Sequence, residues 1–61
     1  MMKTEIEMVP LVFFRESGFY MVPCPQRADQ ELTDVAKENA ECNPGTLRVE
    51  DMTGNVLWAK A

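Results

Sequence analysis

The chain has 61 residues, a net charge of −4 and no histidine, so we expect one small domain over residues 1–61. Its six basic residues occur singly, which disfavours nucleic-acid binding because phosphate neutralisation needs clustered cations. Two cysteines without histidine are too few ligands for a zinc site, and we expect neither a metal nor another cofactor.

The charge pattern near the start of the chain favours a cytoplasmic protein. Glu5 and Glu7 interrupt the apolar stretch that a signal peptide would need. Uncharged runs such as residues 8–14 are far shorter than the about 20 residues of a membrane-spanning helix. We therefore expect a soluble protein that contacts no membrane.

The first third of the chain has the pattern of a β-hairpin. Residues 4–8 alternate between acidic and non-acidic side chains, which predicts a strand with one solvated face. Pro10 cannot donate a hydrogen bond to a neighbouring strand, so it indicates an edge position, a bulge or a break. Residues 11–16 and 19–22 then predict two strands joined by a tight turn, where Gly18 can adopt a positive φ.

The middle of the chain changes to helical spacing. Apolar residues there share one helical face: Ala28, Leu32, Val35 and Ala36. We predict a helix that begins at about residues 26–30 and ends at about residue 42. Two starts fit the sequence, with Pro25 in the first turn or Asp29 as the N-cap. An Asn-Pro-Gly sequence at residues 43–45 then ends the helix.

Four carboxylates form a stripe beside the apolar face of this helix: Glu31, Asp34, Glu38 and Glu41. One interpretation is an acidic docking surface for a basic partner, or a mimic of a nucleic-acid backbone. The other is a solvated helix face that keeps a small protein soluble. We favour the second interpretation because charged helix faces are common.

The last third of the chain has the pattern of a second hairpin. Residues 46–51 alternate and predict a strand, and residues 56–60 predict its partner after a loop that contains Gly54. The whole order is β-β-α-β-β, an α+β fold in which two hairpins form one antiparallel sheet with a single helix packed on one face. This layout resembles that of many small bacterial and phage proteins in topology alone, and it implies no residue roles.

Cys24 is the residue that comes nearest to a reactive group. A thiol near a helix N-terminus can have a lowered pKa, which would suit a small thiol enzyme or redox protein. However, the chain has no histidine to act as a base and no Cys-x-x-Cys motif. We therefore interpret Cys24 and Cys42 as free thiols that pack as small apolar residues, and we expect no enzyme. The predicted helix holds them too far apart for a disulfide.

The first hairpin has large apolar side chains on both faces, and one helix can cover only one of them. We predict that the other face is a protein interface, with these candidate residues: Leu11, Phe13, Tyr20, Val22 and Trp58. The hypothesis is a non-enzymatic interaction module that forms a homodimer or binds another protein. The competing interpretation is that the segment around Pro10 wraps over the uncovered face. The alternative functions are the thiol protein and the acidic mimic.

Overall fold

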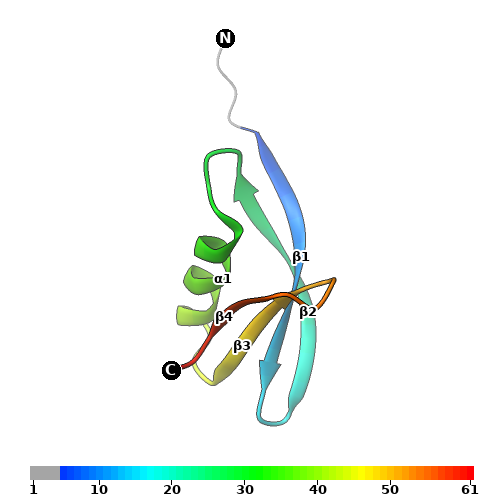
Figure 1. Ribbon diagram of the computed structural model, residues 1–61, viewed down its shortest axis with the longest axis vertical. Helices are drawn as coiled ribbons and strands as arrows, with labels where there is room; N and C mark the ends of the chain where they lie inside the picture. Colours follow the sequence, from blue (N-terminus) through cyan, green and yellow to red (C-terminus); the bar gives the residue numbers. More distant parts are fainter. Residues whose placement is uncertain (1–4) are drawn as a thin grey trace.

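The computed structural model describes residues 5–61 and shows an α+β fold with the expected order of elements (Figure 1). Its elements are β1 (Ile6–Arg15), β2 (Gly18–Arg27), α1 (Leu32–Glu41), β3 (Thr46–Asp51) and β4 (Val56–Ala59). The strands form one antiparallel sheet in the order β2-β1-β3-β4. The α+β prediction is confirmed. Thr4, the first residue of the strand predicted over residues 4–8, lies outside the described residues.

The first hairpin is longer than predicted, and this moves the start of the helix. β2 pairs with β1 along its whole length, from Arg15 opposite Gly18 to Ile6 opposite Arg27. Residues 23–27 are therefore strand, because pairing with β1 gives their backbone N–H and C=O groups more hydrogen-bond partners than an isolated helical turn would. Neither Pro25 nor Asp29 begins the helix, and both predicted starts are wrong.

The chain turns sharply between β2 and α1. The backbone N–H of Gln30 donates to the Arg27 carbonyl at 3.0 Å, and the Gln26 side-chain amide donates to the Gln30 carbonyl at 2.7 Å. Glu31 is the N-cap, but its side chain makes no capping hydrogen bond. Its carbonyl accepts from the N–H of Asp34 at 3.0 Å. Side-chain and backbone hydrogen bonds of the turn thus fix the point at which α1 begins.

The prolines of the hairpin occupy positions that need no N–H donor. Arg15 and Gly18 close a two-residue turn, so they form a hydrogen-bonded pair, and such pairs alternate along the ladder. Pro10 and Pro23 face each other at a non-hydrogen-bonded pair, and Pro25 occupies another. Because β2 is an outer strand, the nitrogens of Pro23 and Pro25 point to the edge of the sheet. Pro10 lies beyond the part of β1 that pairs with β3, so of the three predicted alternatives, an edge position, a bulge or a break, the structure shows the edge position.

The core lies between the sheet and α1. Its buried apolar side chains come from three strands and the helix: Leu11, Phe13, Cys24, Val35, Ala36, Ala40 and Val49. Thr46 is also buried, and its hydroxyl donates to the Asn43 carbonyl at 2.7 Å. In Figure 1, α1 lies along one side of the twisted sheet. Within residues 5–61, no helix or strand covers the other side.

The loop after α1 requires glycine at residue 45. Gly45 has a φ of +98°, in the left-handed region that side chains disfavour. A Cβ atom there would lie 2.6 Å from Nη2 of Arg15. That same guanidinium donates to the Pro44 carbonyl at 2.8 Å. The loop is thus held against the end of β1, and this contact helps to place β3 beside β1.

Candidate protein interface

The residues that we predicted for the interface lie on the face of the sheet that α1 covers. Leu11 and Phe13 are 0% and 2% exposed and form part of the core, so their predicted place in an uncovered face is wrong. Directly paired residues of neighbouring strands point to the same face. Val22 pairs with Leu11, and Tyr20 pairs with Phe13, which places both on the helix side.

Trp58 and Tyr20 are the two predicted interface residues with large partly exposed rings. Trp58 is half-buried against the core and pairs with Val49, so it too lies on the helix side. The ring of Tyr20 is stacked on that of Phe13, with 5.6 Å between the centroids. Both rings therefore extend the core at its margin. The choice of face failed because Leu11 and Phe13 are no more apolar than their neighbours Val12 and Phe14, and alternation alone does not show where the helix goes.

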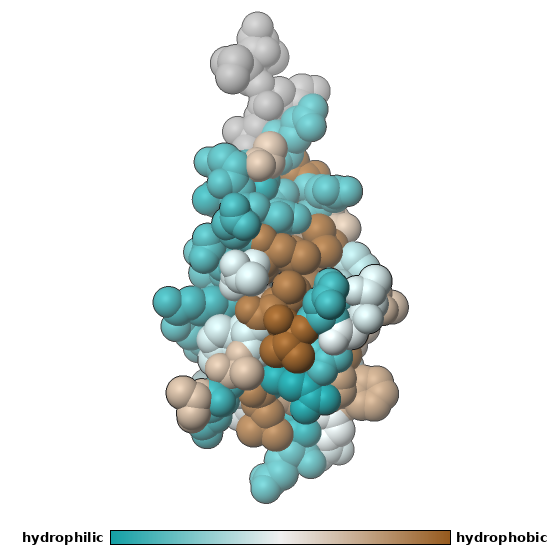
Figure 2. Space-filling view, in the orientation of Figure 1, coloured by the Kyte–Doolittle hydropathy of each residue, from teal (hydrophilic) through white to brown (hydrophobic). Residues whose placement is uncertain are grey.

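The opposite side of the sheet is apolar and uncovered by the rest of residues 5–61. We call it the open face, and its apolar residues are Ile6, Met8, Pro10, Val12, Phe14, Phe19, Met21, Pro23, Pro25, Val56 and Ala59. The same registers place three charged residues on this face: Arg27, Arg48 and Glu50. Five large side chains of this face are more than half exposed: Ile6 59%, Met8 56%, Phe19 71%, Met21 54% and Val56 56%. In Figure 2, apolar surface runs down the middle of the view, while hydrophilic surface dominates the side on which α1 lies.

The exposed apolar area of the open face is large for so small a protein. A large side chain has roughly 170 Å² of surface, near the lower end of the aromatic range, so the four exposed side chains on β1 and β2 expose on the order of 400 Å². Val56 on β4 adds to this area but is separated from them by Glu50 on β3. A contiguous apolar patch of more than a few hundred Å² usually marks an interaction site. The sequence signal for it was the row of apolar residues at alternate positions 6, 8, 10, 12 and 14.

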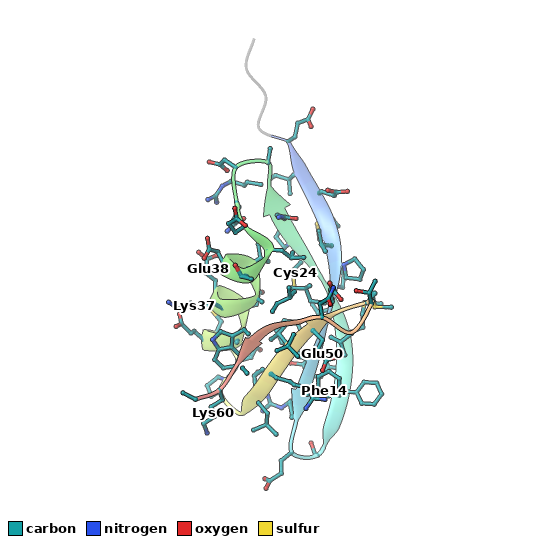
Figure 3. The ribbon with its side chains drawn as sticks, in the orientation of Figure 1. Phe14, Cys24, Lys37, Glu38, Glu50 and Lys60 are labelled. Carbon is teal, nitrogen blue, oxygen red and sulfur yellow. The ribbon has the colours of Figure 1, made fainter. Side chains whose placement is uncertain are left out.

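The β3 part of the open face carries two charged side chains that neutralise each other. The guanidinium carbon of Arg48 lies 3.9 Å from the centroid of the Phe14 ring. Its Nε atom is 2.6 Å from the Glu50 carboxylate. The Phe14 ring also contacts that of Phe19, with centroids 5.4 Å apart. Figure 3 shows Phe14 and Glu50 at the same part of the sheet, away from α1. The open face is thus apolar on β1 and β2, and charged but locally balanced on β3.

The predicted acidic stripe lies on the other side of the molecule. All four of its residues are exposed: Glu31, Asp34, Glu38 and Glu41. Glu38 accepts a hydrogen bond of 3.3 Å from the Gln30 side chain, and it borders a shallow surface hollow that also contains Lys37 and Arg27. Figure 3 shows Lys37 and Glu38 on the outer side of the helix. Because cations lie among the carboxylates, the stripe is a surface of mixed charge.

The two cysteines occupy different environments. Cys24 is buried beneath α1, and its thiol lies 3.6 Å from the Val22 carbonyl, to which it donates (Figure 3). Burial raises the pKa of the Cys24 thiol, the opposite of the effect that a helix N-terminus would have. Cys42 is exposed, so the prediction that it packs as a small apolar residue is wrong for this cysteine. Both are free thiols, as predicted.

The part of the chain that the structure describes offers few other features with chemical meaning. Residues 5–61 contain no cluster of three or more potential metal-ligating side chains. The single helix over the same residues is too short and too polar to cross a bilayer. Comparison with known proteins gave no matching family model, no curated protein of similar sequence and no solved structure of similar fold.

Proposed function

We propose that this chain is a non-enzymatic protein-interaction module whose binding surface is the open face. The observation that carries the proposal is the exposure of Phe19, Met21 and their apolar neighbours on a face that residues 5–61 leave uncovered. Full burial of one large apolar side chain contributes roughly 1.5–3 kcal/mol. Several such side chains on one face supply a driving force for association even after the entropy cost of binding.

The sequence of β1 gives independent support. Every second residue from Ile6 to Phe14 is apolar, which is the pattern of a strand face that is buried. The helix side of the same strand carries Glu7 and Arg15 at its two ends. Within β1, the open face is therefore the more consistently apolar of the two, although α1 covers the other one. A partner protein on the open face would account for this pattern.

The alternative functions have weaker support. A thiol enzyme needs an accessible thiolate, whereas Cys24 is buried and its pKa is raised. A nucleic-acid mimic needs a continuous acidic surface, whereas Lys37 and Arg27 lie among the helix carboxylates. The open face is both accessible and apolar, as a protein-binding surface requires, and the test is therefore directed at it.

The test is site-specific photo-crosslinking in cells that produce the chain. A benzophenone amino acid replaces Phe19, which lies on the open face and is highly exposed. The matched control carries it at Met52, which is similarly exposed but lies in the turn between β3 and β4. We expect covalent adducts with protein from position 19 and few or none from position 52. Equal adduct formation at both positions, or none at position 19, would contradict the proposal.

A further inference from the structure

We infer that the occupant of the open face is a second copy of this chain, packed face to face about a twofold axis; this inference rests on the proposed function. The first argument is the area available. The four large side chains on β1 and β2 expose on the order of 400 Å², and Pro10, Pro23 and Pro25 on the same strands are exposed as well. The total approaches the roughly 600 Å² that each partner buries in the smallest specific interfaces.

The second argument is the distribution of charge. The net charge of −4 would make two copies repel each other if the acidic residues lay in the contact. Glu38 and the other carboxylates of the stripe lie on the outer side of α1, across the sheet from the open face. Within the open face, Arg48 and Glu50 form an ion pair with each other on β3, and Arg27 at the end of β2 pairs with Asp29. The charges of this face are therefore locally paired, so the face carries little net charge that would repel a second copy.

The third argument concerns the edges of the sheet, which offer the other route to self-association. Pro23 and Pro25 remove two of the outward N–H groups of β2, and the outward N–H of Arg27 already donates to Oε1 of Gln30 at 3.2 Å. At the opposite edge, β4 has only 4 residues. The edge of β2 over residues 23–27 and the short edge of β4 are therefore poor templates for another strand. Pro10 likewise interrupts the edge of β1 over residues 6–10, which β3 does not pair with. The copies would instead stack their sheets at the usual separation of about 10 Å.

The test is the molar mass of the purified chain, measured by light scattering from about millimolar to micromolar concentration. We expect a dimer that dissociates on dilution. Met21→Glu places a charge in the open face and should weaken the dimer by about tenfold or more, because the contact would bury an unpaired carboxylate. Met52→Glu makes the same change outside the open face and should leave the dissociation curve unchanged.

Further variants keep the result interpretable. Circular dichroism checks that the Met21→Glu variant is folded. Phe19→Asp is a second charge substitution on the open face, at a side chain that is more exposed than Met21. Replacing Pro23 and Pro25 by threonine restores edge donors and should not strengthen the dimer if the faces make the contact.

A wild-type chain that stays monomeric at every concentration would overturn the inference, as would a dimer that Met21→Glu and Phe19→Asp both leave intact. The proposed function is judged separately. Adducts from position 19 with a different protein would support that function and contradict self-association. An absence of adducts at position 19 would contradict the function itself.

Discussion

Arg48 covers one side of the Phe14 ring, with its guanidinium carbon 3.9 Å from the ring centroid. The two residues are opposite each other in the ladder between β3 and β1. The Glu50 carboxylate holds the guanidinium in place through a contact of 2.6 Å to Nε. Phe14 is consequently half-buried, whereas its neighbour Phe19, which has no such cover, is highly exposed.

This contact should be measurable as a coupling between the two side chains. Arg48→Ala is expected to lower the free energy of unfolding by about 0.5–1 kcal/mol, the usual contribution of an exposed cation–π pair. A double-mutant cycle with Phe14→Leu, followed by urea denaturation, isolates the pair. Glu50→Gln serves as the control for the ion pair. Independent, additive effects of the two substitutions would show that the ring and the cation do not stabilise each other.

The two faces of β1 and β2 should respond differently to the same truncation. Phe13→Ala is expected to destabilise the chain by about 3–5 kcal/mol, because it leaves a cavity in the core. Phe19→Ala removes a ring that is mostly in water and should cost less than about 1 kcal/mol. Urea denaturation, at a concentration at which light scattering shows the chain to be monomeric, measures both variants without a contribution from association. Equal losses would mean that the assignment of core and open face is incorrect.

The thiols should differ in reactivity. Cys42 is exposed and should react with a chromogenic disulfide reagent in the native chain, whereas buried Cys24, with its raised pKa, should react only after denaturation. Cys42→Ser is the control, and the native form of this variant should show no fast-reacting thiol. Rapid labelling of Cys24 in the native variant would revive the thiol-enzyme alternative.

The stability of the turn between β3 and β4 should depend on pH through the ionisation of the Asp51 carboxyl. Hydrogen bonds from the Thr53 hydroxyl and the Asn55 backbone, at 2.7 and 3.0 Å, lower the pKa of the Asp51 carboxyl to about 2. Because the folded pKa lies below the unfolded one, the stabilisation is complete above about pH 4 and is lost as the pH falls toward 2. Carboxyl chemical shifts followed by NMR measure this titration. Asp51→Ala should remove the effect, and a midpoint near 4 in the native chain would contradict it.

The sequence predicted the elements better than it predicted their assembly. Alternation along residues 11–14 correctly separated two faces, since it depends only on local strand geometry. It did not show that Leu11 and Phe13 face α1, because that depends on the side to which the chain turns after Arg27. The helix start was also missed, since only pairing with distant Ile6 to Val9 keeps residues 24–27 extended.

The position of β3 beside β1 likewise comes from contacts between distant residues. Arg15 pairs with Thr46 and also binds the Pro44 carbonyl through its side chain. Neither contact leaves a local pattern in the sequence. The candidate interface could be predicted only in part for the same reason. The sequence showed more large apolar side chains than one helix could cover, but which of them are exposed depended on tertiary packing. That the open face binds a protein stays a prediction.

The three prolines of the first hairpin also restrict how its strands can align. If β2 slipped by one residue relative to β1, either Pro10 or both Pro23 and Pro25 would move to inward positions, where the ladder requires an N–H donor. Each such position would lose a hydrogen bond, and the slip would also turn one strand over. Hairpins of this chain that are misaligned by one residue are therefore less stable than the observed one. The prolines thus disfavour the slip that would exchange the two faces of one strand.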